Sequence, residues 1–367
     1  MKVAIIHDWL NHKVGGAENV VFKLAEMYPE ADIFTLVYNK NKFDKFLGGR
    51  NIVTSGLQKF PSFIKKRPKL FLPFIKRSVE RMDLNGYDLI ISSSTAWVKN
   101  INTPKNSLHI CYCHSPARML WDSWPKYFYE QKPGVLTKLY IIKLASKLRL
   151  WDYYKSQKDI KFIANSEFVQ ARISKFYKKN SKIIYPPVNI EGLEGANEDK
   201  KDFYLILSVL AKYKNIELAI RAFIASGKNL VIAGDGPDMQ RLKEISGNAK
   251  NISFLGRVEE KKKNELMASA KGFIFCNIED FGITIVESIA SGTGVIALEG
   301  GGASEIIIDK QTGVFYKQPN EENLNRAIVE YERTILKNRK FNNKYVFEKF
   351  SEDKFEKDFR SFVNEKQ

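Results

Sequence analysis

Residues 203–233 have the sequence FYLILSVLAKYKNIELAIRAFIASGKNLVIA, and this stretch decides the fold class. Two short apolar runs, Phe203 to Leu207 and Leu230 to Ala233, flank a helical pattern that begins near Lys214. Strands separated by a helix of this length are typical of a parallel sheet, because the chain must cross back before it can pair again. The stretch therefore predicts a strand, a crossover helix and a second strand of an α/β fold.

The same alternation extends over most of the chain. Downstream, helices are predicted from about Pro237, Glu259 and Gly282, between apolar runs at residues 252–255, 273–276 and 295–298. Upstream, a helix over residues 16–27 accompanies apolar runs at residues 3–7, 33–37, 89–92, 108–112, 162–164 and 183–185. We therefore predict two Rossmann-like doubly wound domains that face each other across a cleft.

A break in the pattern separates the two series of strands. Tyr185-Pro186-Pro187-Val188-Asn189 interrupts the alternation, and the polar stretch of residues 191–202 has the composition of a linker. This predicts an N-terminal domain over residues 1–190 and a C-terminal domain over residues 191–349. The Lys-, Glu- and Phe-rich tail is predicted to be helical, and its end, about residues 350–367, is predicted to pack back as a final helix.

Composition limits the classes of function. The 367 residues are 44% apolar and 13% aromatic, which excludes a disordered chain. The formal charge of +17 favours anionic partners, namely nucleotide phosphates, nucleic acid or a membrane surface. Three cysteines exclude a disulfide framework and fit a reducing compartment. No apolar run is long enough for a membrane span, and residues 1–8 resemble a buried strand more than a signal peptide, so we expect a soluble or peripheral protein.

Two short motifs could hold a phosphate. Gly15 and Gly16 follow the strand that ends at His7 and open a helix, where backbone amides can approach an anion. Lys212 and Lys214 lie between the first strand and the first helix of the second domain, where open sheets bind ligands. A plain strand-to-helix turn explains the first pattern equally well, and a solvated lysine pair explains the second pattern better, so neither motif decides the function alone.

The sharpest signal is the run Glu279-Asp280-Phe281-Gly282-Ile283-Thr284-Ile285-Val286-Glu287. The first carboxylate is expected on a loop after a strand, and the second one to two turns into the next helix. Both can point at one ligand while the helix N-terminus faces its phosphate. Carboxylates accept hydrogen bonds from sugar and ribose hydroxyls, so the pattern indicates a nucleotide-sugar site.

This spacing resembles the E-x7-E motif of the family 4 glycosyltransferases, which are retaining enzymes of the GT-B fold. The resemblance covers nearly the whole chain, and further stretches follow the family's order: residues 15–18, 92–94, 114–118, 148–152, 165–166, 213–214, 234–237 and 302–305. His-Ser-Pro-Ala-Arg at 114–118 and Leu-Arg-Leu-Trp-Asp at 148–152 are most similar to the bacterial mannosyltransferase-type branch that builds surface polysaccharides. The resemblance therefore implies GDP-mannose as the first donor to test, within a GDP- or UDP-linked class.

The resemblance also implies roles for individual residues. Glu279 would hold donor-sugar hydroxyls, Glu287 the ribose and Lys214 the diphosphate, while His114 would lie beside the transferring sugar and the acceptor. The implied catalytic residues are His114, Lys214 and Glu279. The implied donor-binding residues are Gly15, Gly16, Lys212, Phe281, Gly282, Ile283 and Glu287. A core histidine with satisfied hydrogen bonds is the alternative for His114.

One position departs from the family pattern. The family usually has an arginine five positions before the lysine, where this chain has Val209. Lys212 is the nearest replacement in sequence. If it cannot take over, the cation that stabilises the leaving group is missing, so a catalytically silent nucleotide-sugar-binding subunit remains an alternative. A nucleotide-sugar epimerase is disfavoured, because the E-x7-E pattern with Tyr213-Lys214 belongs to transferases.

The resemblance further implies a metal-independent reaction without a cofactor. No D-x-D motif that could hold a metal-bound diphosphate occurs in the chain. The expected course is same-face attack, in which the diphosphate leaves, an oxocarbenium-like centre forms and the acceptor hydroxyl enters beside the departing oxygen. The departing phosphate can accept the proton.

The acceptor side is predicted from residues 58–82, which mix eight Lys and Arg residues with bulky apolar ones around a single acid, Glu80. Such a mixture suits an anionic membrane interface, and Pro61, Pro68 and Pro73 exclude one long helix. A solvated basic loop with its apolar side chains in the core is the alternative. The predicted acceptor and membrane residues are Lys13, Lys65, Lys66, Arg67, Lys69 and Arg118.

An aromatic stretch after His114 could line an acceptor groove or simply pack the domain; it comprises Trp121, Trp124, Tyr127, Phe128 and Tyr129. We expect a lipid-linked saccharide acceptor and a cytoplasmic protein that lies peripherally on the inner face of the plasma membrane. Charge alone would permit nucleic acid as a partner, but no binding motif supports it.

Overall fold

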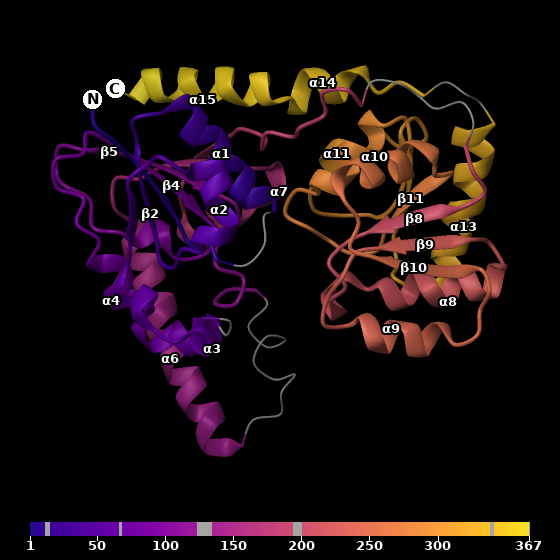
Figure 1. The fold of residues 1–367 in the computed structure, drawn as a ribbon, viewed down its shortest axis with the longest axis horizontal. Coiled ribbons are helices and arrows are strands. Elements are labelled where there is room, and N and C mark those ends of the chain that lie inside the picture. The colour runs from indigo at the N-terminus through magenta and orange to yellow at the C-terminus, as the bar shows by residue number, and fades with distance from the viewer. Residues whose placement is uncertain (12–14, 66–67, 123–133, 194–199, 338–340, 367) are drawn as a thin grey trace. The chain divides into compact units, whose positions relative to one another are not determined.

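The structure is a computed structural model that describes residues 1–11, 15–65, 68–122, 134–193, 200–337 and 341–366. The chain forms two compact units (Figure 1). The first unit comprises Met1–Pro187 and Phe355–Gln367, and the second comprises Val188–Lys354. The division falls just before the predicted boundary at 190/191, because Val188 is buried and its amide donates to the Phe350 carbonyl at 3.0 Å.

The first unit is a seven-stranded, wholly parallel sheet in the order β3-β2-β1-β4-β5-β6-β7. Its strands are β1 (Val3–His7), β2 (Asp32–Thr35), β3 (Ile52–Thr54), β4 (Leu89–Ser94), β5 (Leu108–Cys113), β6 (Lys161–Ala164) and β7 (Ser181–Ile183). The central strands β1, β4 and β5 are buried at almost every position, as expected when both faces of a sheet are covered.

Helices cover both faces of this sheet. One core joins the sheet to α1 (Gly16–Met27), α2 (Lys40–Leu47) and α15 (Glu352–Lys366). The other core joins it to η3 (Val98–Asn100), α4 (Leu72–Glu80) and α6 (Val135–Ser156). A smaller core packs α7 (Glu167–Tyr177) against β5 and β6. The basic segment forms η1 (Gly56–Lys59), α3 (Ser62–Lys65), η2 (Pro68–Phe71) and α4, so the prediction that its prolines exclude one long helix is confirmed.

The second unit is a six-stranded parallel sheet in the order β10-β9-β8-β11-β12-β13. Its strands are β8 (Tyr204–Leu207), β9 (Leu230–Ala233), β10 (Ile252–Gly256), β11 (Gly272–Phe275), β12 (Val295–Leu298) and β13 (Gly313–Tyr316). One face carries α8 (Ile216–Ser226), α9 (Met239–Ser246) and α13 (Glu321–Tyr331), followed by the π-helical turn η5 (Glu332–Leu336). The opposite face carries α10 (Glu260–Ser269) and α11 (Ile283–Ala290), and the short helices α12 (Ala303–Ile306) and α14 (Lys344–Phe350) complete the unit.

The predicted fold class is confirmed, because both units are doubly wound parallel sheets. The final helix expected at about residues 350–367 corresponds to α15, and a second helix, α14, precedes it in the tail. Ser351 has extended backbone angles (φ −66°, ψ 160°) and ends α14, so the tail forms two helices. Phe350 of α14 packs against Phe281 with ring centroids 5.6 Å apart, whereas Phe355 and Phe359 of α15 lie in the core of the first unit.

The strand order identifies one point in each sheet where ligands are expected. β1 lies between β2 and β4, and β8 lies between β9 and β11. The order in which strands are added to each parallel sheet therefore reverses beside β1 and beside β8. At such a switch point the neighbouring crossovers leave for opposite faces and open a crevice at the carboxyl ends of the strands. The residues that follow β1, β4, β8 and β11 are therefore the first place to look for a site.

Candidate active site

Lys214 and Glu279 meet at the switch point of the second unit. After β8 the chain forms the short helix η4 (Lys212–Lys214), and Asn215 in left-handed conformation (φ 53°) turns it into α8. After β11 the chain continues to Asn277 and Glu279. Lys214 Nζ forms an ion pair with Glu279 Oε1, and Asn277 Nδ2 donates to the same oxygen at 3.2 Å. Two of the three predicted catalytic residues thus lie in direct contact.

A glycine run holds the loop that carries Glu279. The Gly302 amide donates to the Glu279 carbonyl at 3.0 Å. A Cβ at Gly302 would lie 2.0 Å from the Phe281 carbonyl oxygen, and one at Gly301 would lie 2.2 Å from the Glu279 carbonyl oxygen. Gly282, with φ +106°, then starts α11. Only residues without a side chain permit this backbone approach, which fixes where the Glu279 carboxylate points.

Glu287 lies on the second turn of α11, as predicted, but it has its own cationic partner. Lys263 Nζ of α10 donates to Glu287 Oε1 at 2.9 Å. Burial raises the pKa of the Glu287 carboxyl above its ordinary value, and the Lys263 ammonium opposes that shift. The two carboxylates that were expected to share one ligand are therefore each paired with a different lysine. Nothing in the sequence pattern singled out Lys263.

Lys212 and Val209 lie beside this pair. Lys212 begins η4, two residues before Lys214, and its side chain is exposed. Arg241 holds the pKa of Asp238 below its usual value, and Lys212 adds to that effect, which places its charge near the start of α9. Val209, where the family has arginine, is 43% exposed. The exposed ammonium of Lys212 is thus the cation nearest in sequence to the position that lacks one.

A chain of polar side chains occupies the switch point of the first unit. His7 ends β1, Ser93 lies near the end of β4, and His114 follows β5. His7 Nδ1 lies 2.9 Å from the Ser93 carbonyl oxygen, and Ser93 Oγ lies 2.8 Å from His114 Nε2. On the other side, His7 Nε2 lies 3.8 Å from Glu18 Oε1 of α1. Of these four residues only His114 was predicted to belong to the site. His7, Ser93 and Glu18 lie in predicted strands or family-like stretches but had no predicted role.

The two histidines of this chain have opposite electrostatic surroundings. Burial lowers the pKa of His114 to about 3, and the neighbouring His7 adds to the shift. Burial also acts to lower the pKa of His7, but the Glu18 and Asp8 carboxylates outweigh it and raise that pKa above its ordinary value. His114 is therefore a neutral imidazole throughout the physiological pH range.

Hydrogen-bond chemistry places a proton on one nitrogen of His7 and allows two arrangements for His114. A carbonyl oxygen only accepts, so the contact with Ser93 requires a proton on His7 Nδ1. The Ser93 hydroxyl can donate to His114 Nε2, which puts the single proton of His114 on Nδ1, or it can accept from a protonated Nε2. In the first arrangement His114 Nδ1–H is a hydrogen-bond donor.

Two carboxylates, Glu18 and Asp8, stabilise the start of α1 and the segment beside the end of β1. Glu18 Oε2 accepts from the Gly15 amide at 2.9 Å, which satisfies the N-cap amide just before α1 begins at Gly16. Asp8 is fully buried and accepts hydrogen bonds from the backbone amides of Thr95, Ala96, Trp97 and Val98 and from the Thr95 hydroxyl. Five hydrogen bonds to one carboxylate fix the loop after β4 beside the end of β1.

The remaining predicted site residues lie in several places. Phe281 is buried against Phe350, and Ile283 begins α11. Arg118 is half-buried four residues after His114, and Lys65 Nζ of α3 donates to the Gln58 carbonyl at 3.3 Å. Lys69 belongs to η2. The predictions for Lys13, Lys66 and Arg67, and for Trp124, Tyr127, Phe128 and Tyr129, fall outside the described residues.

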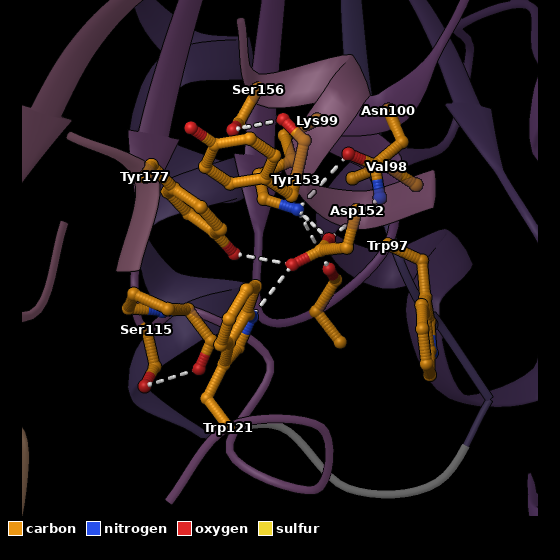
Figure 2. Close-up of polar contacts among 12 residues, drawn as sticks. Trp97, Val98, Lys99, Asn100, Ser115, Trp121, Asp152, Tyr153, Ser156 and Tyr177 are labelled. Atoms are coloured by element: carbon orange, nitrogen blue, oxygen red, sulfur yellow. Dashed lines mark hydrogen bonds and ion pairs between the residues drawn. The ribbon is translucent and has the colours of Figure 1, made fainter. Parts of the chain in front are cut away.

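The Leu-Arg-Leu-Trp-Asp stretch ends in a buried ion pair (Figure 2). Asp152 Oδ1 pairs with Lys99 Nζ and accepts from Asn100 Nδ2 at 2.9 Å. Asp152 Oδ2 accepts from Trp121 Nε1 and from the Tyr177 hydroxyl, both at 2.8 Å. Because its lone pairs are used by partners from η3, α7 and the loop after β5, Asp152 fastens α6 to the rest of the unit.

Two family models match the chain. The model described as "Glycosyltransferase Family 4" matches residues 14–191, and the one described as "Glycosyl transferases group 1" matches residues 194–349. The chain belongs to the family 4 glycosyltransferases. Together the two matches cover residues 14–191 and 194–349, which include β4, β8 and β11 but not β1, and the fold of the chain is GT-B.

Curated relatives are similar at moderate identity. The uncharacterized glycosyltransferase MJ1069 of Methanocaldococcus jannaschii is 28% identical over 41% of this chain and 43% of its own length. The alpha-1,3/1,6-mannosyltransferase ALG2 of Dictyostelium discoideum is 22% identical over 96% of each chain. The phosphatidyl-myo-inositol mannosyltransferase of Mycobacterium leprae is 31% identical over 32% of this chain and 31% of its own length. The chain thus spans less than half of two of these relatives.

Solved structures share the fold over the full length. The crystal structure of HepE from Anabaena in complex with UDP superimposes with a TM-score of 0.69 and 17% identity, covering 100% of both chains. At this identity the likeness is one of fold.

Proposed function

We propose that this glycosyltransferase moves a hexose, with mannose from GDP-mannose as the first candidate, onto a lipid-linked or polysaccharide acceptor in cell-surface glycan synthesis. The observation that carries the proposal is the Lys214–Glu279 pair at the switch point of the second unit. A nucleotide-sugar presents sugar hydroxyls beside a negatively charged diphosphate. A carboxylate such as Glu279 binds hydroxyls, and an ammonium such as Lys214 binds the diphosphate. Relatives named as mannosyltransferases support mannose, and the UDP complex of HepE makes UDP-sugars the next class to test.

In the proposed donor complex each residue exchanges its present partner for the ligand. Lys214, with the exposed Lys212, turns to the diphosphate, and Glu279 and Asn277 bind sugar hydroxyls. Glu287 binds the ribose, and the Lys263 ammonium compensates the charge of this buried carboxylate. The glycine run that positions Glu279 prepares the site before the donor arrives. The lysines supply the positive charge for the leaving group, so we propose a reaction without metal.

The proposed chemistry retains the configuration of the donor sugar. The bond between the anomeric carbon and the phosphate oxygen breaks with its electron pair on the phosphate, and the acceptor oxygen bonds to the same face of the carbon. A neutral imidazole with a pKa of about 3 is a poor base near pH 7, so the acceptor proton passes to the departing phosphate. His114 instead donates Nδ1–H to an oxygen of the sugar or the acceptor.

We also propose that the protein works peripherally at the inner face of the plasma membrane. No helix among the described residues is long and apolar enough to cross a bilayer. Along α4, a hollow of about 400 Å³ is lined by Pro73, Lys76, Arg77, Glu80 and Arg81. Leu70 and Phe74 are exposed beside it, whereas Phe71, Leu72 and Ile75 pack in the core. The hollow is predominantly basic, which suits the phosphate of a lipid headgroup.

The test is sugar transfer from a panel of labelled nucleotide-sugars, led by GDP-mannose, into the lipid fraction of native membranes. Glu279→Gln removes the charge of the site residue, and Glu321→Gln makes the same change on an exposed helix end. We expect label in lipid from one donor with the wild type and the control, and roughly 100-fold less with Glu279→Gln. Equal transfer by Glu279→Gln would remove the carboxylate from the mechanism.

A second candidate, a nucleotide-sugar-binding subunit without activity, is favoured by Val209 alone. Its exposed side chain supplies no cation where the family resemblance leads one to expect arginine. Donor binding by calorimetry without transfer or hydrolysis would support this candidate. Restoring the cation with Val209→Arg would then be expected to raise activity, because the developing phosphate charge regains a fixed partner.

A further inference from the structure

Helix α6 carries apolar side chains on two opposite faces. Ala145, Leu148 and Trp151 pack with α4 in the core of the first unit. The other face is exposed to solvent, although most of its side chains are apolar: Val135, Leu136, Leu139, Tyr140, Leu150 and Tyr154 have exposed fractions of 57–84%. A surface helix normally shows polar residues there, and contiguous exposed apolar surface marks an interaction site.

These exposed side chains form one stripe. At about 100° per residue, the six positions fall within an arc of about 140° on the helix surface. The exposed lysines Lys143 and Lys147 lie within the same arc, between the two groups of apolar residues. The stripe reaches from Val135 to Tyr154 of the 22-residue helix, and its apolar members form two groups, at residues 135–140 and 150–154.

The charge on α6 is of one sign. The helix contains four lysines and one arginine, and its single acid, Asp152, is buried in the ion pair with Lys99. Exposed apolar groups between lysines fit a surface that is anionic outside and apolar beneath, which describes a lipid bilayer with anionic headgroups. The two tyrosines suit the headgroup level, and long lysine side chains can extend to the phosphates. A second copy of the same stripe would oppose lysine with lysine.

The helix is fastened at one end and projects at the other (Figure 1). Its last turns are held by the Asp152 cluster and by Trp151 Nε1, which donates to Glu80 Oε1 of α4 at 2.9 Å. Its first turns, residues 135–140, are exposed and extend away from the sheet of the first unit. A rigid base with an apolar projecting end is the arrangement that insertion into an interface requires.

We infer that the exposed face of α6 inserts into the interfacial layer of an anionic membrane and, together with the basic α4, holds the first unit on that surface. The inference rests on the membrane part of the proposed function and deepens it. It assigns apolar insertion to α6, an element outside the segment of residues 58–82, and leaves electrostatic attraction to α4.

The experiment compares vesicle binding of full-length variants by co-sedimentation. The test variant carries Leu136→Gln, Leu139→Gln and Leu150→Gln, which remove apolar surface without changing charge. The control carries Ile224→Gln and Val329→Gln, which do the same at exposed positions of the second unit. With vesicles of equal parts phosphatidylglycerol and phosphatidylcholine, we expect roughly tenfold weaker binding of the test variant and unchanged binding of the control. Binding of the test variant at wild-type strength would overturn the inference.

Insertion itself is read from a probe on α6. Cys111, Cys113 and Cys276 are buried, so an environment-sensitive dye attaches selectively to Leu139→Cys. We expect a blue shift with the anionic vesicles, none with phosphatidylcholine alone, and quenching by spin-labelled acyl chains. A dye that stays water-exposed on bound protein would overturn insertion. A wild-type dimer that the triple variant dissociates, with vesicle binding unchanged, would assign the stripe to a second copy and equally overturn the inference.

The outcomes separate this inference from the proposed function. Transfer of label to lipid by a triple variant with full vesicle binding would leave the transferase proposal standing and remove α6 from the membrane. Insertion of α6 without transfer from any donor would support the inference and contradict the proposed activity.

Discussion

Burial changes the pKa values of single histidines in this molecule, and His109 gives the simplest test of this effect. It lies on β5, fully buried, with Nε2 2.8 Å from Ser92 Oγ. Burial, assisted by the Lys158 cation, lowers its pKa to about 3. Between about pH 6.5 and pH 3 the unfolded chain therefore binds a proton at His109 that the folded chain does not. The free energy of unfolding must fall as the pH falls through this window.

Replacing His109 by asparagine removes this group from the titration. Each such histidine contributes up to about 1.4 kcal/mol per pH unit to the acid slope of stability. We expect His109→Asn to flatten the slope between about pH 6 and pH 4.5 by roughly that amount, measured by urea unfolding at several pH values. Above about pH 7 both proteins should show the same slope, which serves as the internal control. Parallel slopes in acid would mean that His109 protonates normally in the folded state.

At the same scale, the sequence predicted site residues that belong to recognisable motifs and missed those defined by contacts. Glu279, Lys214 and His114 follow predicted strands, so their positions at the sheet edge could be derived. Lys263 and Ser93 contact predicted site residues across the fold, from α10 and β4. No local pattern marks Lys263, and Ser93 entered only within the stretch of residues 92–94, without a role. Each role depends on which side chain a distant segment brings within hydrogen-bond distance.

Among the elements, the loop of residues 300–302 supports the position of Glu279. A methyl group at Gly302 would overlap the Phe281 carbonyl and Cα, both backbone atoms that cannot rotate away. We expect Gly302→Ala to lower the free energy of unfolding by about 1–3 kcal/mol and to reduce sugar transfer, since the Glu279 loop must shift. Urea unfolding and the transfer assay measure the two effects.

Gly56→Ala is the matched control, because a Cβ there meets no atom within 4 Å and the backbone φ is not positive. This control should differ from the wild type by only a few tenths of a kcal/mol, in either direction. If Gly302→Ala behaved like Gly56→Ala in both assays, the glycine run would not be what positions Glu279.

Elements also differ in how far the sequence predicts them. Strands with buried, uniformly apolar interiors, such as β9 and β12, lie at the predicted residues. The three-residue strand β3 was not predicted, because its apolar run is too short to stand out. Helix α6 was missed as well, since apolar residues on two faces hide the usual amphipathic period. The split of the tail at Ser351 depends on which core each half joins, and that is decided by tertiary packing.

At the scale of the whole molecule, the C-terminal helix α15 belongs to the first unit, which also contains the N-terminus. Phe355, Phe359, Phe362 and Val363 of α15 lie in the same core as Val3, Ile5 and Val20, although more than three hundred residues separate them in sequence. The first unit is therefore completed only by the C-terminal helix. Its stability should depend on contacts that the second unit, Val188–Lys354, does not share.

Phe359→Ala tests this dependence. Phe359 is fully buried and stacks on Phe355 with ring centroids 5.7 Å apart, so its truncation leaves a cavity that costs about 3–5 kcal/mol. Native-state hydrogen exchange resolves the two units separately. We expect amides of β1 and β4 to exchange at least roughly 100-fold faster, and those of β8 and β11 to keep their rates, because only the first unit loses packing.

Phe74→Ala makes the same change at an exposed position and should alter neither set. Equal acceleration in both units would mean that they unfold as one cooperative body, and unchanged exchange in β1 and β4 would mean that α15 does not complete the first core.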